Sequence, residues 1–266
     1  MMELEFAQLS DCGRERDHNE DYLGCALPET PARARTHGWL FALADGVGGQ
    51  EKGEVASRVA VESLLEEFPR APPGELHSHL LPRLVQDANH RVHESGLGAD
   101  EGAAGMASTV VACALRFDRA TVAHVGDSRC YLIRRGKARL LTRDHTMAGE
   151  QVRLGLLSPE RAAEAPTRHV LSRALGSELF VSVETSDLDV RPGDVLLLCS
   201  DGLHNSVSEI EIAAQIGQSE GLESAAQALV EIANQKDGSD NISVQLIRVR
   251  SVERVGMYRG RPYRLR

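Results

Sequence analysis

The chain has 266 residues, of which 42% are hydrophobic and 4% aromatic, and this supports one large domain with an aliphatic core. Its formal net charge of -9 opposes non-specific binding to nucleic acid and to anionic membranes. No apolar run is long enough to span a bilayer, and the first residues lack the segments of a signal peptide. We therefore expect a cytoplasmic protein without membrane insertion and without a nucleic-acid partner.

Alternating or β-branched apolar runs predict strands through most of the chain. In chain order they cover residues 5–10, 39–44, 108–117, 121–125, 130–134, 181–188, 195–199 and 242–249. Apolar residues with helical period predict long helices around residues 61–68 and 80–92, and another at 225–233. Arg135-Gly136 fits a tight turn between antiparallel strands, which favours hairpins over βαβ units. The expected fold class is α+β, with layered sheets and helices.

Two segments stand apart from this pattern. Residues 144–176 are polar and helical without a clear strand, and we interpret this insertion as a flap beside an active site. Residues 251–266 contain five arginines and one glutamate, and they predict a basic, flexible tail. The alternative for the tail is a docking arm for an acidic partner or a membrane surface. No linker divides residues 1–250, which form one predicted domain.

The five cysteines are odd in number and widely separated, without a Cys-x-x-Cys pair. Disulfide frameworks and zinc sites use paired, closely spaced cysteines. We therefore expect reduced core thiols, with a catalytic cysteine as a remote alternative. The residues are Cys12, Cys25, Cys113, Cys130 and Cys199.

Four acidic residues stand where an apolar strand and a turn meet. They are Asp45 before Gly46, Asp127 after Gly126, Asp201 before Gly202, and Asp240 before Asn241. Carboxylates that converge on one cleft repel each other, so they need a cation unless they share protons, and such oxygen ligands favour Mg²⁺ or Mn²⁺ over zinc. Each pair alone is an ordinary turn dipeptide, so the prediction of a metal site depends on all four together.

The segment 10–21 gathers arginines and acids around a turn. A solvated loop is the structural interpretation. In the functional interpretation, one arginine grips phosphate oxygens with its fork of N–H groups, and an adjacent acid borders the metal ions.

Taken together, five motifs resemble those of the metal-dependent protein serine/threonine phosphatases of the protein phosphatase 2C type, especially their compact bacterial branch. The motifs are Asp11-x-Gly13-x-x-Arg16-x-x-Asn19-Glu20-Asp21, Ala44-Asp45-Gly46-Val47-Gly48-Gly49, Gly126-Asp127-Ser128-Arg129, Ser200-Asp201-Gly202-Leu203 and Gly238-Ser239-Asp240-Asn241-Ile242-Ser243. The resemblance covers roughly residues 5 to 249, including the flap, and the motifs are specific in combination.

The resemblance implies a four-layer α-β-β-α sandwich of two mainly antiparallel sheets, with the metal ions between the sheets. It further implies that Asp45 bridges two ions and that the carbonyl of Gly46 helps to hold the second. Asp201 and Asp240 would hold the first ion.

The same resemblance gives roles to four other residues. Asp127 is similar to the aspartate that recruits a third ion in this branch. Glu20 and Asp21 correspond to acids that reach the ions directly or through water. Arg16 matches the arginine that grips the substrate phosphate, and with Asp45 and Asp201 it makes up the expected catalytic set.

The implied reaction is hydrolysis of phosphoserine and phosphothreonine in proteins by a water that two Mn²⁺ or Mg²⁺ ions activate. The implied partners are a bacterial-type serine/threonine kinase and its phosphorylated substrates. One position departs from many eukaryotic relatives, which carry a histidine directly after Asp-Gly as a candidate acid for the leaving group. This chain has Val47 there, so we expect a water at the ions to protonate the leaving oxygen, with His18 and His145 as untested substitutes.

Two other motifs have weaker functional interpretations. His90 and His93 lie one helical turn apart, but no matching ligands follow, and a solvated helix face is the better interpretation. The glycines after Asp45 resemble a phosphate-binding loop of nucleotide enzymes, yet Asp45 would repel phosphate, and Lys52 is followed by Gly53 instead of serine or threonine.

Two rival functions remain at this level. The same ions could serve a phosphatase of small phosphorylated metabolites, which only relative kcat/KM values distinguish. The other rival is a non-catalytic module that binds phosphoproteins or a kinase. Such a module would be recognised by the loss of a metal-binding aspartate, and this chain has all of them.

Overall fold

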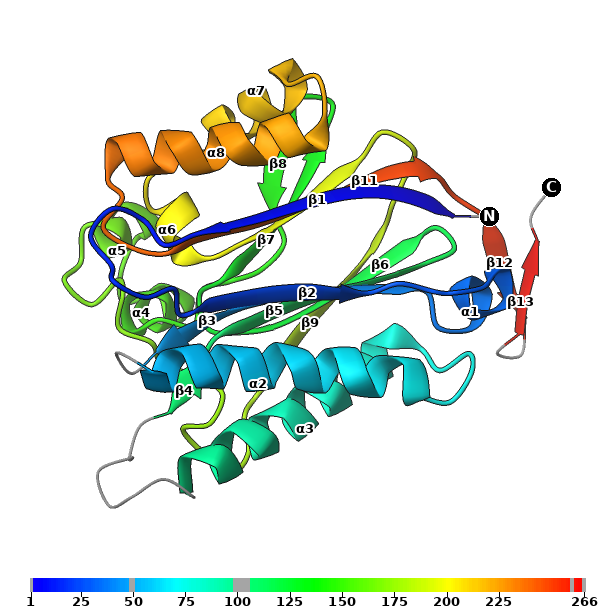
Figure 1. Cartoon of the computed structure of the whole chain (residues 1–266), viewed down its shortest axis with the longest axis horizontal. Coiled ribbons are helices and arrows are strands. Elements are labelled where there is room, and N and C mark those ends of the chain that lie inside the picture. The colour runs from blue at the N-terminus through cyan, green and yellow to red at the C-terminus, as the bar shows by residue number, and fades with distance from the viewer. Residues whose placement is uncertain (1, 48–50, 98–105, 259–260, 265–266) are drawn as a thin grey trace.

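The computed structural model describes residues 2–47, 51–97, 106–258 and 261–264. Two large sheets face each other, and helices cover the outer face of each sheet (Figure 1). All pairings among the described strands of these sheets are antiparallel. The expected α+β fold with an α-β-β-α sandwich is confirmed.

The first sheet has the strand order β1-β11-β10-β7-β8. Its strands are β1 (Glu3–Asp11), β11 (Ile242–Ser251), β10 (Val195–Cys199), β7 (Arg129–Arg134) and β8 (Lys137–Leu140). Arg135 and Gly136 join β7 to β8 with φ angles of 54° and 72°, as the hairpin prediction requires. The outer face carries α7 (Glu209–Gln218) and α8 (Leu222–Lys236), and α8 packs on β1 and β11.

The second sheet has the strand order β2-β3-β5-β6-β9, with β4 paired to the end of β3. Its strands are β2 (Asp21–Ala26), β3 (Trp39–Val47), β4 (Ala107–Ser108), β5 (Val110–Arg116), β6 (Arg119–Val125) and β9 (Glu184–Asp189). The long helices α2 (Glu51–Glu67) and α3 (His77–Leu97) cover it, and α1 (Pro31–Thr36) and the short 3-10 helix η1 (Phe68–Arg70) lie in the connections. The predicted early helices are confirmed.

Side chains alternate between two separate cores because successive residues of a strand point to opposite faces. On β3, Leu40 and Ala42 pack against α2 and α3, while Phe41 and Leu43 pack between the two sheets. All four are fully buried. A strand that is apolar on both faces therefore leads to Asp45 near its end, the residue that the sequence assigns to the metal ions.

The sequence did not predict β2, which is short, lies at the sheet edge and contains a glycine. A Cβ at Gly24 would lie 2.7 Å from Cδ1 of Leu65, so the glycine lets α2 pack closely on this strand. The predicted strand 108–117 is divided into β4 and β5 at Thr109. The hydroxyl of Thr109 accepts from the backbone N–H of Asp45 at 3.0 Å, so the residue at the break between β4 and β5 holds the backbone of Asp45.

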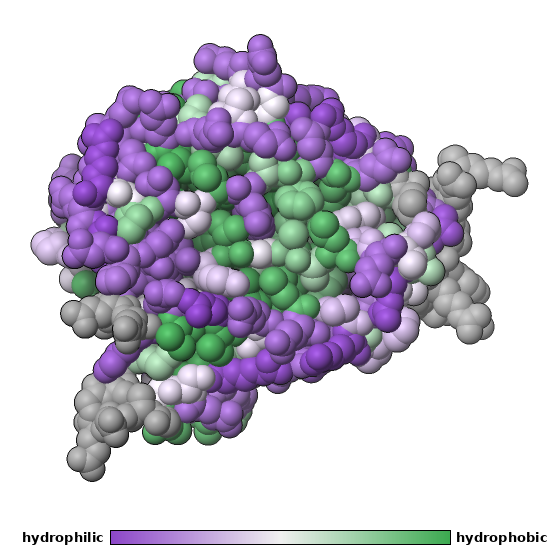
Figure 2. Space-filling model, viewed as in Figure 1, coloured by the Kyte–Doolittle hydropathy of each residue, from purple (hydrophilic) through white to green (hydrophobic). Residues whose placement is uncertain are grey.

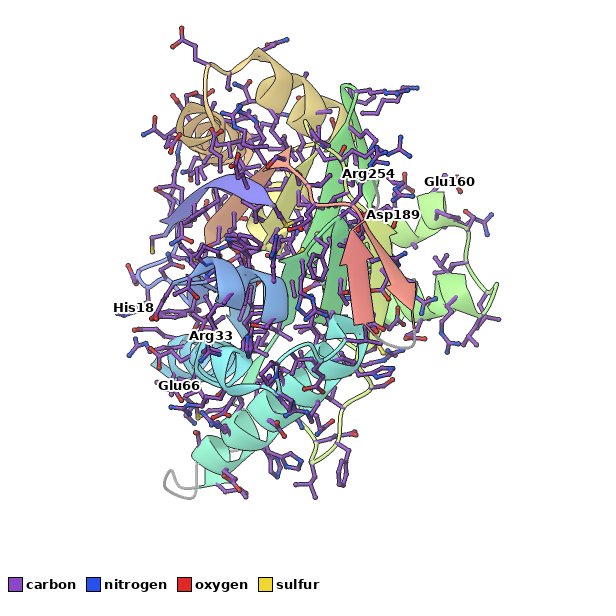
Figure 3. The ribbon with its side chains drawn as sticks, turned by 90° about the vertical axis from the view of Figure 1, so that its right-hand side faces the viewer. His18, Arg33, Glu66, Glu160, Asp189 and Arg254 are labelled. Atoms are coloured by element: carbon purple, nitrogen blue, oxygen red, sulfur yellow. The ribbon has the colours of Figure 1, made fainter. Side chains whose placement is uncertain are left out.

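The segment predicted as a flap contains α4 (Met147–Arg153) and α5 (Pro159–Ala163). An internal bridge joins Leu171 to Thr146, and a bridge from Leu175 ties the segment to Ser108 of β4. Glu160 of α5 lies at the periphery of the molecule (Figure 3). In the predicted tail, β12 (Val255–Tyr258) and β13 (Arg261–Arg264) form a hairpin separate from both large sheets. The flexibility of this tail stays a prediction.

Apolar side chains reach the surface along the open edge of the sandwich between β1 and β2 (Figure 2). Leu4, Phe6, Leu23 and Cys25 are partly buried there against the core between the sheets. Within the described ranges, no helix combines the length and the apolar character needed to cross a membrane.

Candidate active site

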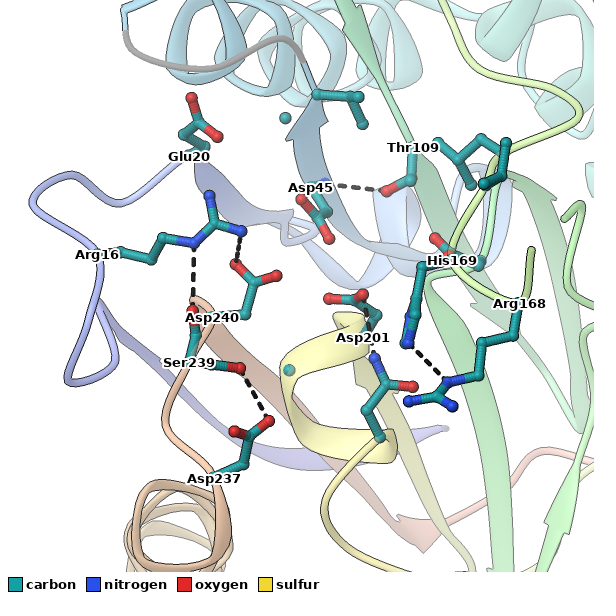
Figure 4. Close-up of a pocket in the computed structure, with 17 residues that line it drawn as sticks. Arg16, Glu20, Asp45, Thr109, Arg168, His169, Asp201, Asp237, Ser239 and Asp240 are labelled. Atoms are coloured by element: carbon teal, nitrogen blue, oxygen red, sulfur yellow. Dashed lines mark hydrogen bonds and ion pairs between the residues drawn. The ribbon is translucent and has the colours of Figure 1, made fainter. Parts of the chain in front are cut away.

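The predicted acids meet in one cavity at the end of the sandwich. Asp45 lies near the end of β3, and Asp21 opens β2 directly opposite it in the antiparallel register. Asp201 begins α6 (Asp201–His204) two residues after β10, and Asp240 lies two residues before β11. Figure 4 shows Asp45, Asp201 and Asp240 pointing toward one another. Strand ends from both sheets therefore supply the carboxylates, as the sequence predicted.

The cavity has a volume of about 800 Å³. Besides Asp45, Asp201 and Asp240, it is lined by Arg16, Glu20, Gly46, Val47, Thr109, Asp127, Arg168, His169, Val170, Leu171, Gly202, Asn205, Asp237 and Ser239. Every predicted site residue except Asp21 therefore lines it. Asp21 is 7% exposed and lies beneath the others, where its carboxylate accepts from the hydroxyl of Ser200 at 2.7 Å.

The electrostatics of the cluster disfavour four negative charges at once. Burial, followed by the charges of the other aspartates, raises the pKa of Asp45 well above its ordinary value. Burial also raises the pKa of Asp21 to about 7, partly offset by hydrogen bonds from serine hydroxyls, and that of Asp201 to about 6. Asp127 has its pKa raised to about 7 by burial and by Asp201. A divalent cation would remove this repulsion.

Oxygen atoms without partners test whether the residues fit metal ions. Buried Oε1 of Glu20, Oδ1 of Asp21 and Oδ1 of Asp201 have no hydrogen-bond partner among the described residues. Buried oxygens of this kind are rare in proteins, because an unsatisfied acceptor loses its hydration. Carboxylates are also the ligands that Mn²⁺ and Mg²⁺ prefer. The donor set therefore fits hard divalent cations.

Gly46 is required by a close approach of backbone segments. A Cβ at this position would lie 2.1 Å from the carbonyl oxygen of Gly53 and 2.8 Å from that of Glu20. The N–H of Gly46 donates to the carbonyl of Glu20 at 3.0 Å. No larger residue fits here, so glycine keeps the start of α2 packed against the strand end that bears Asp45. Gly48 and Gly49 of the same motif lie outside the described residues.

The loop that carries Arg16 is fastened to the cluster by Asn241. Its amide donates to the carbonyls of Cys12 and His18 at 2.9 and 3.0 Å, and its oxygen accepts from the N–H of Glu20 at 2.8 Å. Arg16 then reaches the cavity rim, 3.0 Å from the carboxylate of Asp240. The guanidinium thus lies beside the predicted metal ligands, and its contact with substrate phosphate stays a prediction.

The histidines weighed as substitutes for Val47 do not reach the cavity. His18 is exposed and lies at the edge of the molecule (Figure 3). His145 is fully buried, and its Nδ1 accepts from the backbone N–H of Gly126 at 3.2 Å. On α3, His93 contacts the carbonyl of Gly176 at 2.9 Å, which is a structural contact.

A separate group, His124, His145 and Glu184, brings three potential ligand atoms within 4.8 Å of one another. Nε2 of His124 contacts the backbone oxygen of Arg143 at 2.9 Å, and the side chain of Arg143 pairs with Glu184. Arg173 lies 3.3 Å from Nε2 of His145 and 3.5 Å from Glu184. Two arginines repel a cation, so we assign this group a structural role in joining the flap to the sheet.

Several residues of the cavity were missed at the sequence level. Thr109 holds the backbone of Asp45 and contacts the hydroxyl of Ser128 at 2.7 Å. Asn205 donates to Asp201 at 3.2 Å, four residues along the chain. The Asn-after-Asp spacing on a helix could have indicated Asn205. No sequence signal indicated that His169 of the flap would line the cavity.

Comparisons with known proteins agree with this geometry. The family model "Protein phosphatase 2C" matches residues 12–246. The serine/threonine phosphatase stp of Listeria welshimeri is 35% identical over 258 residues, which cover 95% of this chain and 96% of the relative. The solved serine/threonine phosphatase of S. agalactiae is 32% identical, with a TM-score of 0.84, over 93% of this chain and all of that one.

A further solved structure contains metal ions. The catalytic domain of the serine/threonine protein phosphatase PstP, in complex with two manganese ions, is 32% identical, with a TM-score of 0.78, over 94% of this chain and 99% of that one. The fold, the carboxylate cluster and these matches define a metal-dependent phosphatase. More particularly, this chain belongs to the protein phosphatase 2C family.

Proposed function

We propose that this chain hydrolyses phosphoserine and phosphothreonine in proteins. The observation that carries the proposal is the convergence of Asp45, Asp201 and Asp240 in one cavity, with Arg16 at its rim. The names of the similar phosphatases support the same substrate class.

The chain's own residues provide a place for the ions. Asp45 would lie between two of them, with the carbonyl of Gly46 on the second and with Asp201 and Asp240 on the first. When bound, the ions supply an activated water and offset the negative charge of the phosphate. Glu20 and Asp21 would complete the surroundings of the ions, directly or through water.

Arg16 would bind the substrate. Its guanidinium offers parallel N–H donors to two phosphate oxygens, and the loop anchored by Asn241 holds it beside the carboxylates. The phosphate would then lie with its phosphorus facing the carboxylate cluster and its serine or threonine oxygen directed away from it. This orientation allows in-line displacement by water.

The metal in use is proposed to be Mn²⁺ or Mg²⁺, with two core ions and a third near Asp127. All-oxygen ligands and the two manganese ions in the PstP structure support the first part. The raised pKa of Asp127, caused by burial and by Asp201, supports a cation at that aspartate.

The proposed partners are a bacterial-type serine/threonine kinase and the proteins that it phosphorylates. The proposed location is the cytoplasm. All five cysteines are free, and three of them are fully buried, which fits a reducing compartment.

The test is release of phosphate from a phosphothreonine peptide with Mn²⁺, with EDTA, and with the variant Asp201→Asn. We expect turnover that needs both the metal and Asp201, and a higher kcat/KM on phosphopeptides than on small phosphorylated metabolites. Preference for a metabolite would replace the proposed substrate class, and a folded protein inactive with Mn²⁺ and Mg²⁺ would support a binding module instead.

A further inference from the structure

Hydrolysis of a serine or threonine phosphate leaves a strongly basic alkoxide oxygen, and a hydrogen-bond donor aimed at that oxygen lowers the barrier. The residue directly after Asp45-Gly46 is Val47, whose side chain lines the cavity but cannot donate. We propose that His169, in the segment after α5, donates its Nδ1–H to the leaving oxygen. This inference rests on the proposed function.

His169 is placed for this role. Among the described residues, it is the only histidine that lines the cavity of Asp45, Asp127 and Asp201. Figure 4 shows its ring between Asp201 and Arg168, directed into the cavity. The imidazole therefore borders the same cavity as the carboxylates, beside Asp201.

The neighbouring arginine selects one tautomer of the ring. Nε of Arg168 donates to Nε2 of His169 at 2.7 Å, so Nε2 is an acceptor and the proton of the neutral ring lies on Nδ1. Partial burial, followed by the positive charge of Arg168, lowers the pKa of His169. The ring is therefore a neutral donor at neutral pH, and its Nδ1–H points away from Arg168.

The backbone around His169 is fixed on its C-terminal side. The N–H of Met147 donates to the carbonyl of Val170 at 2.7 Å, and that of Ser172 donates to the carbonyl of His145 at 2.8 Å. The N–H of Val170 closes a turn on Thr167 at 3.2 Å. These bonds join the segment to α4 and to the buried His145, so the imidazole is presented by an ordered turn.

The step conserves atoms and protons. A water oxygen forms a bond to phosphorus, and the bond from phosphorus to the serine or threonine oxygen breaks. The attacking water releases one proton to solvent, and the departing alkoxide takes up one proton from solvent. His169 stays neutral throughout. It stabilises the charge that builds on the leaving oxygen, and this stabilisation is worth more for an aliphatic alkoxide than for a nitrophenolate, whose charge is already delocalised.

The test compares leaving groups in wild type, His169→Leu, His169→Gln and the control His90→Leu, an α3 position outside the cavity. With Mn²⁺, we expect His169→Leu to lose about 10- to 10²-fold in kcat/KM on a phosphothreonine peptide, and less than about 3-fold on 4-nitrophenyl phosphate. His169→Gln, which keeps an N–H donor, should recover part of the loss on the peptide, and His90→Leu should match wild type. Melting temperatures of all variants verify that the fold is retained.

Equal losses on both substrates would overturn the proposal, because they would place His169 on the phosphate or on the flap structure. An unchanged kcat/KM on the peptide in His169→Leu would overturn it as well. If the wild-type protein turns over neither substrate with Mn²⁺, the proposed function fails. If wild type is active but the variants show no dependence on the leaving group, the proposed function stands and only the role of His169 is rejected.

Discussion

Buried and partly buried carboxylates occur in two settings in this protein, and the settings differ in the source of the opposing charge. Asp194, whose side chain is 3% exposed, accepts from Nε and Nη2 of Arg134 at 2.8 and 2.6 Å. Asp144 is paired with Arg129 in the same two-pronged way. By contrast, no ion pair joins Asp45 or Asp201 to an arginine or lysine in the described part of the chain.

The pKa directions follow this difference. Burial alone would raise the pKa of Asp144, but the hydrogen bonds and charge of Arg129 outweigh it, and the pKa is lowered. Burial and neighbouring carboxylates raise the pKa of Asp45. They also raise the pKa of Asp201, because the opposing hydrogen bond from Asn205 and the charge of Arg16 are too weak to offset them. A carboxylate shielded from water therefore needs either a side-chain cation or a bound one. Asp45 and Asp201 are left for a bound cation, whereas Asp240 already lies 3.0 Å from Arg16.

The largest effect is expected from Asp45→Asn. Removing the proposed bridging carboxylate should lower kcat/KM on a phosphothreonine peptide by about 10³-fold, the upper end of losses seen when one catalytic electrostatic group is removed. The metal-free variant should be at least as thermally stable as metal-free wild type, because like-charge repulsion is reduced. If activity is lost only because the variant unfolds, Asp45 has a structural role like that of Asp194 and does not hold a metal ion.

The next effect is on stability. Asp194→Ala should destabilise the fold by about 3 kcal/mol, because Arg134 would be left as an unpaired charge. Chemical denaturation measures this, and kcat of the folded protein should be unchanged. Asp189→Ala is the matched control, since Asp189 is 72% exposed and lies 3.7 Å from Arg119; its loss should stay below about 1 kcal/mol. Equal losses in both variants would contradict the structural role of Asp194.

Arg16→Ala should have an intermediate effect on catalysis. Loss of a charge-assisted grip of about 1.5 to 3 kcal/mol corresponds to a drop of about 10- to 10²-fold in kcat/KM. Arg14→Ala, two residues away and outside the cavity, is the control and should be near wild type. An unchanged kcat/KM in Arg16→Ala would remove this arginine from the site.

The smallest effect is the pH dependence of the metal-free protein. The pKa of Asp21 is raised from 3.8 to about 7, so between these values the folded state binds more protons than the unfolded state. The protonated carboxyl of Asp21 therefore contributes to the free energy of unfolding at about pH 4 and below, and this contribution is lost as the pH rises toward 7. Thermal melts in EDTA should show a falling Tm over this range, and excess Mn²⁺ should reverse the trend. A rising Tm in EDTA would mean that the carboxylates are compensated within the chain.

The sequence was sufficient for features that depend on local order along a strand. Asp45, Asp201 and Asp240 each follow or precede an apolar run, so their position at a sheet rim could be predicted. Pairing across the sheet could not be predicted in the same way. Asp21 was assigned by resemblance alone, and its place opposite Asp45 depends on β2, an edge strand whose Gly24 weakens the pattern.

The flap shows a second limit. His145 and His169 both belong to the polar insertion, and nothing in their neighbours along the chain distinguishes them. The structure buries His145 under Gly126 and places His169 in the cavity. The positions of these two histidines depend on how α4 packs and on the bridge between Thr146 and Leu171. Such contacts between distant residues leave no local pattern in a single sequence.

Calorimetric titration of the metal-free chain with Mn²⁺, for wild type, Asp45→Asn and Asp194→Asn, tests whether carboxylates without a side-chain cation hold metal ions. We expect at least two ions to bind to wild type and to Asp194→Asn, and tight binding to be lost in Asp45→Asn with the fold intact. Absence of Mn²⁺ binding by folded wild type, or unchanged binding by Asp45→Asn, would contradict the claim that the unpaired carboxylates hold metal ions.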